Sequence, residues 1–131
     1  LAPLMAAIHL GFLPSRVKTK AELAQVLNTA ASIPWGQGCT KREYGSLIFI
    51  GHHPQAEVYI MPVGKKPDLV LRTFTEALTL LGGDPSNYRL INCETIFKKR
   101  TNNSFLASRL SCEIYNIIGS IVTAVQKGLT E

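Results

Sequence analysis

The sequence predicts a single α/β domain of three layers, with a mixed and mostly parallel sheet that includes one hairpin at about 46–63. Three observations lead to this prediction. The chain has 131 residues, the size of one domain, and its 46% hydrophobic and 18% charged residues are typical of globular proteins. Apolar runs that resemble strands alternate with amphipathic stretches that resemble helices. Two of the apolar runs flank a short turn, as in a β-hairpin.

The first two predicted elements are helices. The first ten residues carry apolar side chains at helical spacing, and Gly11 can end this helix in the left-handed conformation. Thr19 and Glu22 form a capping box that opens a second helix over about 20–31. Residues 33–45 are rich in turn formers and are predicted to be a loop.

The middle of the chain predicts the hairpin and a third helix. The continuous apolar run 47–50 is typical of a buried strand, and 58–61 is its partner across a loop at 52–56. Residues 68–81 place apolar side chains on one stripe, follow a proline and end at two glycines, so they predict an amphipathic helix.

The last part of the chain predicts two more strands and a helix. Residues 88–92 and 120–124 resemble short strands, and a helix near 103–116 separates them. If this helix and the one at 68–81 are crossover connections, then the strands at 57–63, 88–92 and 120–124 all run in the same direction. Ligands of open α/β sheets bind beyond the carboxyl ends of such strands. The loops that follow these strands are therefore the candidate ligand-binding loops.

Two of these loops are basic, and each is expected to lead into the N-terminus of a helix. The first loop carries Lys65 and Lys66, and the second carries Lys98, Lys99 and Arg100. Free N–H groups and the helix dipole attract anions at such a place. The sequence thus predicts a phosphate site on this edge of the sheet, although neither loop matches a P-loop and two solvated basic loops are the simpler alternative.

Two neighbouring residues are further candidates at the same edge. Glu94 could act as an acid or base, or ligate Mg²⁺ beside a bound phosphate. Cys93 could be a nucleophile, but the chain has no histidine close to it in sequence, so a buried thiol is the simpler interpretation. Catalytic residues and cofactors thus remain unknown at this point.

The pair His52–His53 attracts attention as a metal or catalytic site. Adjacent residues of a strand point to opposite faces, so both can bind one metal ion only if the turn twists them together. A third ligand would have to come from Cys39, Glu57 or His9, and no metal-binding spacing is present. We therefore expect polar turn residues and no metal site, and we expect His9 to be a partly buried histidine of the first helix.

Charge and cysteine content limit the partners and the compartment. The net charge of +5 favours anionic partners, but no long basic tail makes nucleic acid a strong candidate. Three widely spaced cysteines do not form a disulfide framework, so reduced thiols in the cytoplasm are expected. No apolar stretch reaches the ~20 residues that span a bilayer, so we expect no membrane association.

Several stretches resemble a small bacterial family that is known only as a domain of unknown function. These stretches are AAIHLGFLP (6–14), TKAEL (19–23), EYGSLIFIG (43–51), AEVYIMPVG (56–64) and LLGGDP (80–85). The resemblance implies that a strand and a Gly-rich turn precede the first helix and are missing here. Leu1 already lies inside an apolar helix-like run, which agrees with a domain of 1–131 truncated at its N-terminus. The family supplies no substrate.

The leading functional hypothesis is binding of a phosphorylated small molecule or nucleotide at the carboxyl-end edge of the sheet. The alternative is a non-enzymatic interaction or regulatory module, which could be a homodimer. An enzyme that uses Cys93 ranks behind both.

Overall fold

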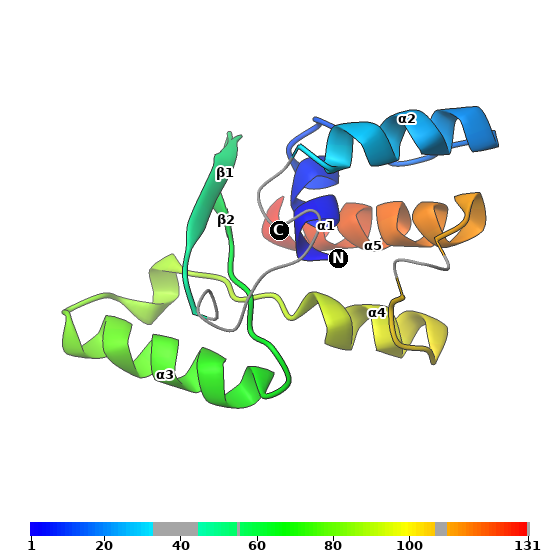
Figure 1. The fold of residues 1–131 in the computed structure, drawn as a ribbon. Helices are drawn as coiled ribbons and strands as arrows, with labels where there is room; N and C mark the ends of the chain where they lie inside the picture. The colour runs from blue at the N-terminus through cyan, green and yellow to red at the C-terminus, as the bar shows by residue number, and fades with distance from the viewer. Residues whose placement is uncertain (33–44, 55, 107–109, 131) are drawn as a thin grey trace.

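The computed structural model describes residues 1–32, 45–54, 56–106 and 110–130 (Figure 1). Its elements are α1 (Ala2–His9), α2 (Lys20–Ala30), β1 (Ile48–His53), β2 (Ala56–Ile60), α3 (Pro67–Leu80), the 3-10 turn η2 (Pro85–Asn87), α4 (Cys93–Thr101) and α5 (Cys112–Thr130). In Figure 1, α1, α2, α4 and α5 lie together on the right, and the hairpin and α3 lie on the left. The chain is a mixed α/β protein.

The hydrophobic core lies among α1, α2, α4 and α5. Helix α5 buries one face, on which Tyr115 and Ile118 are fully enclosed and Ile121 and Val122 nearly so. The cluster that these four residues join contains Leu4, Met5, Ala7, Ile8, Leu13, Val17, Leu23, Val26 and Phe97. Because α5 supplies apolar side chains three and four residues apart, its packing requires a helix and excludes a strand at the same positions.

Two of the predicted strands are therefore wrong. Residues 120–124 lie inside α5, where Ile121 and Val122 belong to a buried helical stripe. Residues 88–92 form no strand: Tyr88, Arg89 and Leu90 are exposed, and the side chain of Asn92 caps α4 by accepting a bond from the Thr95 N–H (3.2 Å). In the part of the chain that the structure describes, the sheet has two antiparallel strands, so the predicted three-layer, mostly parallel sheet is not found.

The predicted hairpin is confirmed, but its turn is shorter than expected. Strand β1 continues to His53 and β2 begins at Ala56, and the ladder pairs His52 with Glu57 and His53 with Ala56. The two histidines are thus strand residues and not loop residues. These two pairs account for the shorter turn, because they extend the ladder into residues that the sequence predicts to be part of the loop.

A β-bulge interrupts the hairpin. Phe49 faces Tyr59 across the ladder and Gly51 faces Val58, so Ile50 is an additional residue on β1. The bulge shifts the alternation of faces by one residue. Phe49 therefore shares the outer face of the hairpin with His52, and their rings lie 5.0 Å apart.

Helix α5 also holds the loop between α1 and α2. The Tyr115 hydroxyl donates to the carbonyl oxygen of Pro14. The amide of Asn116 accepts a bond from the Val17 N–H (2.8 Å) and donates to the Val17 carbonyl oxygen (3.0 Å). A side-chain amide thus takes the place of a neighbouring strand for Val17, whose backbone would otherwise be buried without partners.

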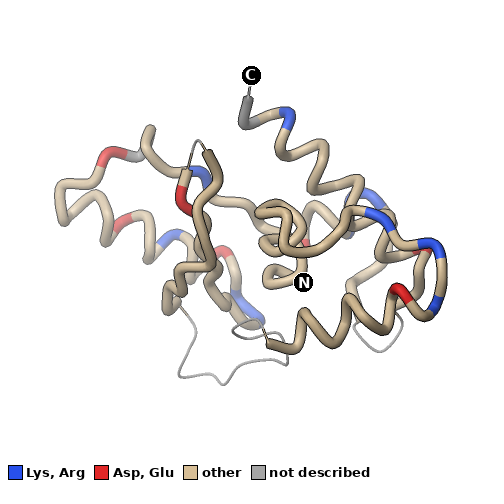
Figure 2. Tube along the Cα trace, turned by 90° about the horizontal axis from the view of Figure 1, so that it is seen from above, with Lys and Arg blue, Asp and Glu red and all other residues tan. Residues whose placement is uncertain are grey.

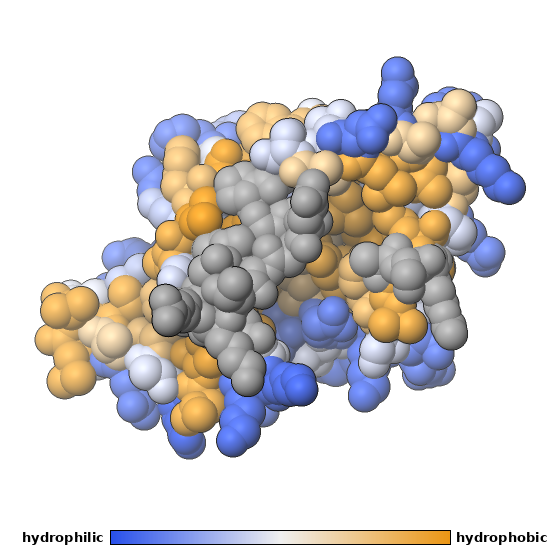
Figure 3. Space-filling view, in the orientation of Figure 1, coloured by the Kyte–Doolittle hydropathy of each residue, from blue (hydrophilic) through white to orange (hydrophobic). Residues whose placement is uncertain are grey.

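The predicted helix at 68–81 is confirmed as α3, which ends before Gly82 in the left-handed region (φ 84°). In the described part of the chain, none of its side chains is buried. Leu80 and Leu81, at its C-terminal end, are 87% and 86% exposed. Figure 3 shows hydrophobic side chains gathered at this end of the helix, on the left.

Candidate anion-binding site

The start of α3 has the local structure that an anion site requires. Gly64 takes a positive φ of 65°, and Lys66 is the N-cap residue. Within the described residues, no side chain accepts a hydrogen bond from the first turn of α3. Pro67 has no N–H, so the N–H groups that follow it are the donors that face solvent here. The helix dipole adds partial positive charge to this end.

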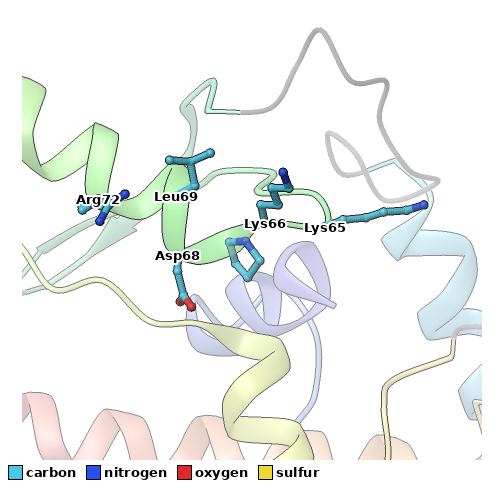
Figure 4. Close-up of a pocket in the computed structure, with 6 residues that line it drawn as sticks. Lys65, Lys66, Asp68, Leu69 and Arg72 are labelled. Atoms are coloured by element: carbon cyan, nitrogen blue, oxygen red, sulfur yellow. The ribbon is translucent and has the colours of Figure 1, made fainter.

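A shallow, open hollow of about 490 Å³ lies at this helix start (Figure 4). The residues that line it are Lys65, Lys66, Pro67, Asp68, Leu69 and Arg72. Three of them are cationic and one is acidic. The sequence prediction included both lysines and missed Arg72, which lies four residues after Asp68 and therefore one helical turn away on the same side. That spacing is the signal by which Arg72 could have been found.

Figure 4 also shows how the charged groups are directed. Lys65 extends away from Arg72, and the carboxylate of Asp68 points to the other side of the helix start from Lys66. The cationic groups therefore surround the hollow without meeting at one point. Long, flexible lysine stems can turn toward a ligand, and a guanidinium can offer two parallel donors to a phosphate.

The other half of the predicted site is elsewhere. Lys98, Lys99 and Arg100 lie in the last turn of α4, at its C-terminal end and not at a helix N-terminus. The correction has a physical reason, because cations near free carbonyl groups complement the negative end of the helix dipole. These three residues thus suit the end of α4, and the structure does not bring them to the hollow at α3.

Glu94 and Cys93 lie in the first turn of α4, close to Leu1 at the start of α1. An acidic side chain at a helix N-terminus interacts favourably with the helix dipole. This interaction accounts for the position of Glu94 without a metal ion. Burial raises the pKa of the Cys93 thiol to about 11, so little thiolate exists at neutral pH. The Sγ atom lies 3.9 Å from the Ile91 carbonyl oxygen. These observations disfavour Cys93 as a nucleophile.

The structure separates the two adjacent histidines and joins one of them to a third. His52 lies on the outer face of the hairpin, whereas His53 stacks on His9 of α1 with ring centroids 4.6 Å apart. Within the described ranges, no group of three His, Cys, Asp or Glu side chains could hold a metal ion. Cys39, one predicted third ligand, lies outside the described residues.

Fold and site together define a mixed α/β protein with a helical core, a docked hairpin and a basic, uncapped helix start. The chain belongs to the DUF3189 family of proteins of unknown function, which residues 1–114 match. This confirms the predicted resemblance to an uncharacterised family. Neither a curated protein nor a solved structure shows significant similarity to the chain. Among the described helices, none has the length and apolar character needed to cross a bilayer.

Proposed function

We propose that the protein binds a phosphorylated small molecule or nucleotide at the start of α3. The observation that carries the proposal is the combination of an uncapped helix N-terminus with Lys65, Lys66 and Arg72 around one hollow. Backbone N–H groups and the dipole supply the fixed part of such a site, and the three side chains supply mobile positive charge. The proposal includes a cytoplasmic location, which the widely spaced cysteines favour.

A small ligand fits this arrangement better than a nucleic acid. A protein that follows a phosphate backbone needs a continuous basic surface, because each contact neutralises another phosphate. Figure 2 shows Lys and Arg distributed over several elements, with acidic residues between them. Asp68 also lines the hollow, and its negative charge opposes the approach of a polyanion.

Thermal unfolding with a defined set of probes tests the proposal. Inorganic pyrophosphate and ATP are the anionic probes, and adenosine is the uncharged control. A ligand present at 100 times its Kd stabilises the folded state by about 2.7 kcal/mol. We expect stabilisation by at least one anionic probe and none by adenosine. The absence of stabilisation at millimolar pyrophosphate and ATP would show that the proposal is wrong.

A pair of double variants locates the site. Lys65→Ala/Lys66→Ala removes two charges beside the hollow, and Lys98→Ala/Lys99→Ala removes the same charge at the end of α4. The first variant should lose the stabilisation and the second should retain it. An equal loss in both variants would indicate unspecific attraction to net charge and contradict a site at α3.

An interaction module is the second candidate function, and a different observation favours it. Leu47, Phe49 and Tyr59 on the hairpin and Leu80 and Leu81 after it are between 46% and 87% exposed. Large exposed apolar areas often mark contact surfaces between proteins. Sedimentation velocity over a range of concentrations tests self-association, and a monomer throughout would exclude the homodimer form of this candidate.

A further inference from the structure

The stacked pair of His9 and His53 joins two elements that the sequence separates by more than 40 residues. His9 ends α1 and His53 ends β1. Their rings are 4.6 Å apart and inclined by 27°. Gly51 belongs to the same contact, because a Cβ atom there would lie 3.0 Å from Leu10 Cδ1. The histidine pair therefore lies in the interface by which the hairpin rests on α1.

The β-bulge decides which histidine takes part. Because Ile50 is an additional residue, His53 faces α1 while His52 turns outward to Phe49. The two histidines have the same chemistry and are adjacent in sequence, but one lies in the interface and the other lies on the outer face. His52 can therefore serve as the control residue for substitutions of His53.

Among the described residues, the neighbouring elements β2 and α5 carry one and two charged residues, respectively. On β2, the Glu57 carboxylate lies on the outer face and accepts a bond from the Tyr59 hydroxyl (2.6 Å). Helix α5 contributes the neutral amide of Gln126, which donates to the His9 carbonyl oxygen (3.0 Å). The charged residues of α5 are Lys127 in its last turn and Glu113 in its first turn, at the opposite end of the helix from Gln126.

The remaining neighbours of α1 do not add a counter-charge either. The charged residues of α2 are Lys20 and Glu22, in its first turn. Figure 1 places this turn at the end of α2 that is far from the hairpin. Within α1, His9 is the titratable side chain. Among the described residues, the pair therefore faces no carboxylate that would compensate two positive charges.

We infer that the stack of His9 and His53 makes the contact between the hairpin and α1 acid-sensitive. The rings pack together when both are neutral. Protonation of both places like charges side by side in a partly buried interface, which weakens the contact and frees the hairpin to open. The inference concerns the hairpin alone and is independent of anion binding at α3.

The direction of the pH dependence follows from the protonation of the folded state. Burial lowers the pKa of His9, and charge on His53 lowers it further. A histidine with a lowered pKa binds fewer protons when folded than when unfolded, so stability rises with pH in that range. Its full contribution is present above the ordinary histidine pKa of about 6.5 and is lost as the pH falls through that value toward the lower folded-state pKa.

NMR on the intact chain tests the inference with three proteins: the native sequence, His53→Gln, and His52→Gln as the matched control. Titration of the imidazole signals gives the pKa of His9, and amide exchange gives the protection of the hairpin. In the native sequence, hairpin protection should fall several-fold between pH 7.5 and pH 5. His53→Gln should raise the pKa of His9 and reduce that fall, whereas His52→Gln should change neither.

Two results would overturn the inference. One is a His9 in the native sequence that titrates with the ordinary histidine pKa, since this measurement does not depend on any variant. The other is a His52→Gln protein whose His9 pKa and hairpin protection change as much as those of His53→Gln. In that case an unspecific effect on the strand, and not the stacked pair, would account for the pH dependence.

Discussion

Replacement of Gly119 by alanine tests the close approach of α5 to the loop between α1 and α2. A Cβ atom at Gly119 would lie 1.8 Å from the Ser15 carbonyl oxygen and 2.8 Å from its carbonyl carbon. Both atoms belong to the backbone, so no side-chain rotation can relieve the clash. To reach even 3.0 Å from the present 1.8 Å, the loop or the helix must retreat by about 1.2 Å.

The expected cost follows from what this retreat disturbs. Overpacking of a core position costs about 1–3 kcal/mol. Two hydrogen bonds between Asn116 and Val17 cross the same contact, and stretching them costs about 1 kcal/mol each. The higher helix propensity of alanine offsets about 1 kcal/mol of this loss relative to glycine. We expect a net loss of about 2–4 kcal/mol in the free energy of unfolding.

Urea unfolding followed by circular dichroism measures this loss. With a slope of about 2 kcal/mol/M, the midpoint should fall by about 1–2 M. Gly128→Ala is the matched control on the same helix, because a Cβ there meets only the flexible guanidinium of Arg89 at 3.4 Å. The control should unfold at or slightly above the native midpoint. A Gly119→Ala protein as stable as the native one would refute the reasoning.

Two further predictions concern the same core. Asn116→Ala should lower the free energy of unfolding by about 2–4 kcal/mol, because the buried N–H and carbonyl groups of Val17 would each lose a partner; unchanged urea unfolding would contradict this. Cys93 should react slowly with iodoacetamide, since a pKa of about 11 instead of 9.0 leaves about 100-fold less thiolate at pH 7.5. Peptide mass spectrometry measures that rate, and labelling as fast as that of an unfolded cysteine would disprove the burial.

The sequence predicts those elements whose signals are local. Thr19 and Glu22 do form the cap of α2: the Thr19 hydroxyl accepts from the Glu22 N–H, and the Glu22 carboxylate accepts from the Lys18 N–H (2.8 Å). The helix at 68–81 is correct to within a residue at each end because Pro67 and Gly82 mark its ends. The hairpin also follows from two apolar runs around a turn.

The errors arise where a local pattern fits two structures. Ile121 and Val122 favour a strand by type, but with Ile118 and Tyr115 they form a helical stripe. Whether an apolar run becomes a strand or a helix depends on its partners, and here those partners are the distant residues of α1. Local propensity carries no information about them.

The candidate site shows the same division. The sequence places Lys65 and Lys66 at a helix start, because Pro67 marks that start beside them. The sequence predicts a loop before a helix at Lys98, Lys99 and Arg100, whereas the structure has the helix α4 there. These residues therefore lie at the C-terminal end of a helix and not at an N-terminus. The stack of His9 on His53 has no sequence signal, since it depends on the bulge and on how the hairpin docks.

The contact of α5 with the loop at 14–17 also affects how the chain folds during synthesis. The residues that meet there, such as Val17 and Asn116, are 99 positions apart. A ribosome therefore releases α1 long before α5, its main packing partner, has been made. Until α5 emerges, the side of α1 that packs against it has no cover, and the nascent chain exposes an apolar surface to which chaperones can bind. Folding of this core thus waits for the synthesis of α5.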